Sequence, residues 1–310
     1  MSASASPSSL WIRSALAAAA PWSWFLVRNL GWIAEPFAVA FPLLALLGVA
    51  LSGTFAVVGR NRRTLMVTAS ILALAIVVVA GPRRPRTTAA PIDPLRVVSA
   101  NVFDQNSTPL DAARALASTD ADVLVAVETG REFPRMLADA DSRRPFVVTG
   151  PGIVVRARYP LRVLPLSSSL PEERSLRVLV ERPAGSVVLY VVHALNPAYQ
   201  STFARQLSFV TRLSLAAERE TDPVVIAGDF NMSDRQLGYR RMTSVFRDAA
   251  RAGWASNTYD FSFWRLLLLR IDFVFVERSW CAARSGRFDV PGSDHQGVVT
   301  TIGPCPSTEG

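Results

Sequence analysis

Two long uncharged apolar stretches near the N-terminus most constrain how this chain can fold. They cover residues 36–58 and 64–82, which is 23 and 19 residues. As a helix rising about 1.5 Å per residue, even the shorter stretch would reach about 28 Å, close to the thickness of a bilayer core. Arginines flank both stretches, as they do at the edges of membrane spans. We therefore expect two transmembrane helices here, and a pair of buried core helices is the alternative.

A third apolar segment precedes them, at about residues 10–28, and it is shorter, rich in alanine and interrupted by Pro21. It is compatible with a third span, an interfacial helix or part of a signal-like start. Residues 1–82 are thus predicted to form a membrane region. The Pro-rich polar residues 83–94 indicate a tether. A globular domain is expected at residues 95–302, followed by a short tail at 303–310.

The charge of the chain is concentrated in the predicted membrane region. Residues 1–90 hold eight arginines and a single acid, Glu35, whereas residues 91–310 hold 25 arginines and 24 acids. The globular part is therefore almost neutral, which argues against a surface built for nucleic acid. The positive-inside rule places Arg60–Arg63 in the cytoplasm and hence the domain outside, although Arg83–Arg86 favour the opposite orientation. We predict a multi-pass protein of the cell membrane with an extracytoplasmic domain.

The two cysteines, Cys281 and Cys305, are too few for a cysteine-rich metal site. They could pair on an oxidising side of the membrane, but two separate buried thiols are the simpler expectation.

Short β-branched runs alternate with helical stretches over the predicted domain. The runs expected to be strands are 95–100, 123–127, 146–149, 153–155, 176–180, 187–192, 224–227, 271–276 and 297–301. Helices are expected at 109–118 and 200–219. Many strands with few long helices predict an α+β or layered α/β sandwich.

Polar residues that could carry chemistry fall at the ends of these predicted strands. They are Asn101, Glu128, His193, Asp229, Asn231, Asp272, Asp294 and His295. Because strand ends in a layered sandwich converge on one face, these distant residues could form one site. The chain has only two histidines, and both belong to this set.

The segments around these residues read AN, VE, VVHALNP, GDFN, RIDFVFV and SDH. Taken in this order, they resemble the endonuclease/exonuclease/phosphatase superfamily, the DNase I-like metal-dependent phosphodiesterases, here in a membrane-anchored bacterial form. The resemblance covers roughly residues 95–302 and implies a four-layer α/β/β/α sandwich after two or three transmembrane helices. It departs from the family pattern at Val127, Ala157 and Ala194, none of which is a catalytic position.

The resemblance implies a metal site and a phosphate-binding site. Glu128 and Asn101 match metal-binding residues, and Asp294 of the terminal pair is expected to join them. Mg²⁺ is the expected cofactor, with Mn²⁺ as the alternative, because hard cations take oxygen ligands. His193 and Asn231 match residues that grip the scissile phosphate.

The remaining matches concern the attacking water. Asp229 matches the acid that orients or deprotonates this water, and His295, steadied by Asp272, would act as general base or stabilise the charged transition state. The choice between Asp229 and His295 as the base stays open at this point. The predicted activity is Mg²⁺-dependent hydrolysis of a phosphoester, with a nucleic acid, a phospholipid or a small ester as substrate and the bilayer as partner. A non-catalytic membrane-tethered scaffold with the same fold is the alternative.

An aromatic and apolar stretch lies just before the RID motif. It contains Trp254, Tyr259, Phe261, Phe263 and Trp264, followed by four leucines. A core helix or strand is the plain interpretation. Proximity to the bilayer or to a lipid-like substrate is the sharper hypothesis, because Trp and Phe favour that interface.

Overall fold

The structure is a computed structural model of the whole chain. It describes residues 30–59 and 89–306, except 198, 254 and 262–265, together with 12, 16, 62, 65–70, 72–73 and 84–85. The chain divides into two compact units, Met1–Arg83 with Arg235–Leu237, and Arg84–Asp234 with Gly238–Gly310. The second unit contains every residue of the predicted site.

In the N-terminal unit, the 3-10 helix η2 (Gly31–Ala34) leads into helix α3 (Glu35–Gly59). Among the described residues, no single helix meets the length and apolarity expected of a membrane span. Two consecutive helical segments, Gly31–Phe41 and Leu43–Thr54, are long and apolar enough only when taken together, and the angle between them is 59°. The bend falls at Pro42, which has no N–H for the helix ladder.

The other predicted spans are described only in part. Residues 65–70 and 72–73 of the expected second span are helical. The rest of that span, and almost all of the expected third span at 10–28, lie outside the described residues.

The second unit contains two mixed six-stranded sheets. The first sheet has the order β13-β14-β1-β2-β4-β3, in which β1 and β2 are parallel. Its strands are β1 (Leu95–Asn101), β2 (Val123–Val127), β3 (Phe146–Gly150), β4 (Ile153–Ala157), β13 (Trp280–Asp289) and β14 (Gln296–Pro304).

The second sheet has the order β5-β6-β7-β8-β12-β9, in which β7 and β8 are parallel. Its strands are β5 (Leu161–Val163), β6 (Ser175–Val180), β7 (Val187–His193), β8 (Val224–Asp229), β9 (Arg247–Asp248) and β12 (Asp272–Val276). The 3-10 helix η4 (Ala249–Ala252) directly follows β9.

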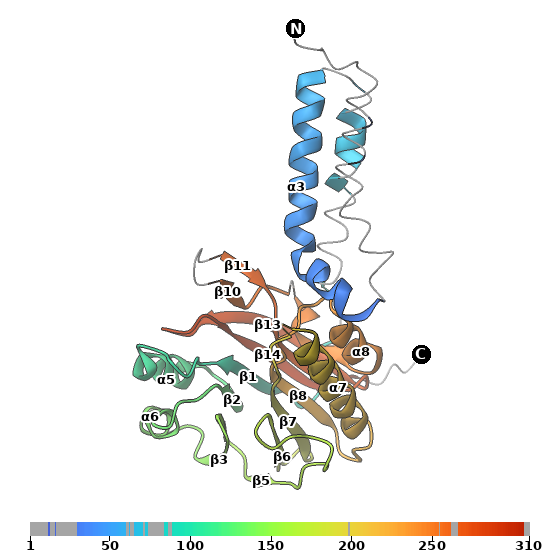
Figure 1. Cartoon of the computed structure of the whole chain (residues 1–310). Coiled ribbons are helices and arrows are strands. Elements are labelled where there is room, and N and C mark those ends of the chain that lie inside the picture. The colour runs from blue at the N-terminus through green and yellow to red at the C-terminus, as the bar shows by residue number, and fades with distance from the viewer. Residues whose placement is uncertain are drawn as a thin grey trace. The chain divides into compact units, whose positions relative to one another are not determined.

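Helices cover the outer face of each sheet, so that the unit has four layers (Figure 1). Helices α5 (Pro109–Ser118) and α6 (Phe133–Ala140) pack on the first sheet through Leu116 and Leu137. Helices α7 (Gln200–Ala217) and α8 (Leu237–Val245) pack on the second through Leu213 and Met242. A third core of branched aliphatic side chains lies between the sheets. The predicted DNase I-like sandwich is therefore confirmed.

Several elements were not expected from the sequence. Strand β13 was missed because WCAARSGRFD has little β-branched character, and its pairing with β14 overrides that weak propensity. Strands β5 and β9 and helices α6 and α8 were also missed; they are short elements whose local signal is weak.

The aromatic stretch before RID forms a separate two-stranded hairpin, β10 (Tyr259–Phe261) with β11 (Leu266–Leu269). The stretch is therefore strand and not helix, whereas its place in a core stays a prediction. Trp254, Phe263 and Trp264 lie outside the described residues.

The two cysteines form a disulfide, Cys281–Cys305, with their Cα atoms 4.9 Å apart. The bond joins the start of β13 to the residue after β14, next to the Trp280↔Pro304 pair of the same ladder. The expectation of two separate thiols was wrong, because the antiparallel register of β13 and β14 brings residues 24 apart in sequence side by side.

Candidate active site

The strand ends that carry the predicted residues meet at one end of the sandwich. Asn101 ends β1, and Glu128 directly follows the neighbouring parallel strand β2. In the second sheet His193 pairs with Asp229 at the ends of β7 and β8. Strand β12 runs antiparallel to β8, so its first residue, Asp272, pairs with Asp229 as well. Asp294 and His295 lie directly before β14.

Asp229 is the centre of the resulting hydrogen-bond network. The amide Nδ2 of Asn101 donates to Asp229 Oδ2 over 3.1 Å. Asn231 donates twice, from its backbone N to Asp229 Oδ1 at 2.7 Å and from Nδ2 to Oδ2 at 3.2 Å. His295 Nε2 lies 3.9 Å from the same Oδ2. The Asp229 carboxylate is thus held in a fixed orientation with one oxygen facing His295.

His295 is held from its other side by Asp272. Its Nδ1 lies 2.9 Å from Asp272 Oδ2, and both side chains are almost fully buried. The ring of Tyr259 meets the His295 ring edge-on, with centroids 5.0 Å apart. The backbone N of Asp272 donates to Thr258 Oγ1. The histidine is therefore fixed both in position and in the direction that its Nε2 faces.

Glu128 and His193 form the more open side of the site. Glu128 Oε1 lies 2.8 Å from His193 Nε2, and the two side chains are 24% and 23% exposed, so solvent and ligands can reach them. Asp294 lies on the His295 side, with its Oδ1 3.9 Å from His295 Nε2. The structure thus brings all eight predicted site residues into one cluster.

The charges of the cluster shift several pKa values. Burial alone would lower the pKa of His295, but the carboxylates of Asp272, Asp229 and Asp294 outweigh it and raise the pKa to about 10. Burial raises the pKa of Asp229 to about 6 against the opposing charge of His295. Burial also raises the pKa of Asp294.

Glu128 responds in the opposite direction. Although burial opposes it, hydrogen bonds from His193 and Asn101 lower the pKa of this carboxyl. Without a bound cation, the described site therefore favours a charged His295 beside an ionised Glu128.

Two site residues adopt the left-handed backbone region that ordinarily favours glycine. Glu128 has φ +51° and Asn231 has φ +49°. Such a conformation costs of order 1–3 kcal/mol in a non-glycine residue and persists where the surroundings impose it. Next to the site, Gly228 has φ +140°, and a Cβ there would lie 2.0 Å from the carbonyl oxygen of Val192. Backbone strain thus accumulates where the site residues must be aimed.

Four supporting residues were not assigned a role from the sequence. Gln206 Nε2 donates to the carbonyls of Leu195, Phe230 and Asn231, fixing the loop that carries Asn231. Its signal was a polar residue on the buried face of α7. Ser293 Oγ accepts from His295 N and donates to the carbonyl of Asn101. Thr258 and Tyr259, described above, had no local signal for contact with Asp272 and His295.

Comparison with known proteins identifies the family of the chain. The family model described as the Endonuclease/Exonuclease/phosphatase family matches residues 98–295. The chain therefore belongs to this family of phosphoester hydrolases. No curated protein sequence is significantly similar to the chain.

Solved structures show the same fold. An endonuclease/exonuclease/phosphatase from Beutenbergia cavernae is 21% identical with a TM-score of 0.54, covering 68% of this chain and 72% of its own. Sphingomyelinase C from Streptomyces griseocarneus is 15% identical with a TM-score of 0.53, covering 68% of this chain and 99% of its own. Beta toxin from Staphylococcus aureus is 14% identical with a TM-score of 0.53, covering 66% and 99%. At these identities the similarity concerns the fold.

Proposed function

We propose that this protein is a divalent-cation-dependent phosphodiesterase, held at a membrane by its N-terminal region. The observation that carries the proposal is the network centred on Asp229, in which a buried carboxylate faces a histidine that a second carboxylate orients. Such a pair serves to activate a water and to stabilise developing negative charge.

The donor set fits a hard cation such as Mg²⁺ or Mn²⁺. Four carboxylates, those of Glu128, Asp229, Asp272 and Asp294, face only two histidines, and burial opposes the ionisation of Asp229 and Asp294. A cation would relieve this crowding of negative charge. Two groups of described residues offer three ligand atoms within 4.8 Å of one another: Glu128 with His193 and Asp229, and Asp229 with Asp272 and His295.

The first of these groups suits the cation better. His295 in the second group already uses Nδ1 on Asp272, and its raised pKa favours the charged ring, which cannot bind a metal. Glu128 of this group, at the open side, is the ligand that we assign to the cation, whereas His193 and Asp229 act on the phosphate and the water. Asn101 and Asp294, which lie outside this group, are its further oxygen ligands in the proposal. When bound, it would neutralise charge on the phosphate oxygens.

The protein's own groups divide the remaining tasks. Asp229 is our candidate for accepting the proton of the attacking water, because His295 is the charged partner in this arrangement. His295 would then stabilise negative charge with its Nε2–H, and Asp272 would keep its ring in position. His193 and Asn231 are the candidate donors to the phosphate.

We propose a lipid or small phosphodiester as the substrate class, in preference to nucleic acid. The region after residue 90 carries 25 arginines and 24 acids, so it lacks the charge excess that phosphate-backbone binding uses. Sphingomyelinase C, one of the proteins of similar fold, is named for a phospholipid substrate.

We further propose that the domain faces the outside of the cell membrane. The uncharged stretches 36–58 and 64–82 and the arginines between them support anchoring in this orientation. The disulfide Cys281–Cys305 is an independent argument, since disulfides persist in oxidising compartments.

The test is hydrolysis by the full-length protein in detergent micelles. The substrates are bis-p-nitrophenyl phosphate, p-nitrophenyl phosphate, plasmid DNA and sphingomyelin-containing vesicles, each with Mg²⁺, Mn²⁺ or EDTA. We expect metal-dependent hydrolysis of a diester, reduced at least 100-fold in Asp229→Asn.

Asp139→Asn is the matched control, because Asp139 is an exposed carboxylate on α6, away from the site. Its activity should equal that of the wild type. A folded protein that binds Mg²⁺ without hydrolysing any of the four substrates would contradict the proposed substrate classes. A folded protein that neither binds metal nor hydrolyses would favour the non-catalytic scaffold.

A further inference from the structure

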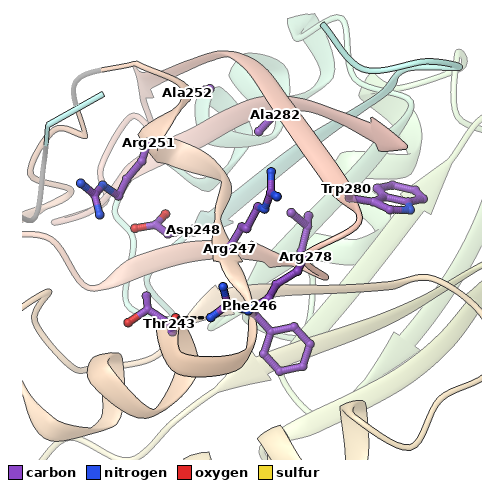
Figure 2. A pocket seen from close by; sticks show the side chains of 10 residues that line it. Thr243, Phe246, Arg247, Asp248, Arg251, Ala252, Arg278, Trp280 and Ala282 are labelled. Atoms are coloured by element: carbon purple, nitrogen blue, oxygen red, sulfur yellow. Dashed lines mark hydrogen bonds between the residues drawn. The ribbon is translucent and has the colours of Figure 1, made fainter. Parts of the chain in front are cut away.

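A second polar cavity lies away from the candidate active site, at the other end of strand β12. Its volume is about 280 Å³, and Figure 2 shows the side chains around it. The lining residues come from the end of α8 and the residue after it, from β9, from η4, and from the end of β12 through the turn to the start of β13. They are Thr243, Phe246, Arg247, Asp248, Arg251, Ala252, Val276, Arg278, Trp280 and Ala282.

The cavity is distinct from the candidate active site. Strand β12 starts at Asp272, inside the site, and ends at Val276, in the cavity wall. Four residue-to-residue steps of extended strand place these positions about 13 Å apart. No residue of the cavity wall belongs to the network around Asp229.

Three arginines, Arg247, Arg251 and Arg278, line the cavity together with one acid, Asp248. Asp248 is already neutralised, because both of its oxygens lie 2.5 Å from Nη2 of the buried Arg270. It also accepts from the hydroxyl of Tyr239 at 2.8 Å. The charge of Asp248 is therefore not free to balance the arginines of the cavity.

Arg247 is the central cation of the cavity. It is half-buried and stands between Arg251 and Trp280 in Figure 2. Among the described residues, the hydrogen-bond partners of its side chain are sulfur atoms, Cys305 Sγ at 3.7 Å and Cys281 Sγ at 4.0 Å from Nη1, and sulfur is a weak acceptor. It forms no ion pair with any acidic side chain in the described part of the chain. A half-buried guanidinium without an anionic partner favours binding of an external anion.

The other two arginines are positioned by backbone carbonyls. Arg278 donates to the carbonyls of Val245 at 3.0 Å and Ser244 at 2.6 Å, where α8 ends. Arg251 donates to the carbonyl of Arg84 at 3.0 Å. Carbonyl partners hold the Arg278 side chain in place without neutralising its charge. Arg278 therefore adds to the positive potential of the cavity around Arg247.

The cavity wall also restricts what the anion can be. The lining also includes three apolar residues, Phe246, Val276 and Trp280, all nearly fully buried. A volume of about 280 Å³ is just below the range of roughly 300–1,000 Å³ for drug-sized ligands, so it suits a headgroup-sized molecule. The planar fork of arginine matches the oxygens of phosphate.

We infer that this cavity is a second ligand site, which binds a phosphomonoester group through Arg247 and Arg278. The phosphate could belong to a lipid headgroup or to a soluble phosphate compound, and the chemistry of recognition is the same.

The experiment measures phosphate binding by the full-length protein in detergent micelles. Isothermal titration calorimetry with inorganic phosphate and with glycerol 3-phosphate is carried out in EDTA at constant ionic strength. The wild type is compared with Arg247→Gln and Arg247→Lys. We expect Arg247→Gln to weaken binding at least tenfold and Arg247→Lys to weaken it less, because lysine keeps the charge but not the fork.

Arg114→Gln is the matched control, because it removes an exposed arginine of α5 on the other sheet. It should bind phosphate as the wild type does. Any phosphate bound at the candidate active site contributes equally to all four proteins, so the difference reports the cavity. Hydrolysis of bis-p-nitrophenyl phosphate and the unfolding temperature in chloride buffer check that the Arg247 variants are folded.

A second arm separates the two sources of phosphate. The unfolding temperature is measured in micelles doped with phosphatidic acid or with phosphatidylcholine. A rise with phosphatidic acid in the wild type but not in Arg247→Gln, without binding of glycerol 3-phosphate, supports the lipid source. Binding of glycerol 3-phosphate that depends on Arg247 supports the soluble source. Equal phosphate binding by wild type and Arg247→Gln, or no binding by the wild type of any of the three ligands, overturns the inference.

Discussion

Replacing Asp272 by Asn should lower the pKa of His295 and destabilise the metal-free protein at neutral and mildly acidic pH. Asp272 Oδ2 is the carboxylate oxygen closest to the ring, 2.9 Å from Nδ1, whereas Asp229 and Asp294 lie 3.9 Å from Nε2. An amide keeps the shape of the carboxyl group and removes its charge. The charged ring then loses its nearest counter-ion while remaining buried.

The size of the effect follows from the pKa. A rise from 6.5 to about 10 corresponds to roughly 5 kcal/mol of preference for the charged ring in the folded state, at about 1.4 kcal/mol per unit. Because the folded value is the raised one, this stabilisation is fully present below pH 6.5 and is lost as the pH rises through 10. Removing the nearest of three carboxylates should lower the pKa of His295 by about 2 units or more. At pH 6 this corresponds to a loss of about 3 kcal/mol of unfolding free energy.

The measurement is direct, because the chain has only His193 and His295. Their ring resonances can be titrated by NMR in EDTA, and the unfolding free energy can be followed by urea denaturation between pH 6 and 10. Asp139→Asn again serves as the control for loss of one carboxylate. A His295 pKa that stays above 9 in Asp272→Asn, or a wild-type value near 6.5, would refute the reasoning.

Three further predictions concern stability. Gly228→Ala should lower the unfolding free energy by more than about 3 kcal/mol, because its Cβ would lie 2.0 Å from a backbone oxygen. Gly286→Ala, whose Cβ would have its nearest atom at 3.8 Å, should lower it by less than about 1 kcal/mol. Urea denaturation measures both, and equal losses would contradict the clash. Cys281→Ser should lower the unfolding free energy by about 3 kcal/mol in the same measurement under oxidising conditions. Reductant should lower the unfolding temperature of the wild type but not of the variant, and an unchanged wild type would count against the bond. Burial raises the pKa of Tyr239, so the unfolding free energy should fall as the pH rises above 10, and less steeply in Tyr239→Phe; identical slopes from pH 8 to 11.5 would disprove this.

Much of the candidate site could be predicted from the sequence because its residues obey a local rule. Strands such as VLVAV and VVIAGD are buried on both faces, so a polar side chain has few places except a strand end. That rule located Glu128 and Asp229 and, with the order of the motifs, the family. The strands of the cores were predicted well for the same reason, since their continuous β-branched runs leave little choice of structure.

Other features had no local signal. Arg143 and Arg144 are neighbours in a polar segment, yet Arg144 is fully buried and donates to the carbonyls of Thr119 and Ala121 at 2.9 and 3.0 Å. Strand β13 likewise has a weak pattern and exists because β14 pairs with it. Both depend on partners distant in sequence, which a local pattern does not specify.

The sequence by itself determined which residue types the protein places at its strand ends, because burial of an uncompensated polar group inside a strand is costly. Only the tertiary structure decided which atoms meet. Strand register and layer packing produce three of the features described above: the approach of His295 to Asp229, the Cys281–Cys305 bond and the cavity around Arg247. Register is set by pairing across the whole sheet, so contacts between residues 20 to 200 positions apart appear only once the chain has folded.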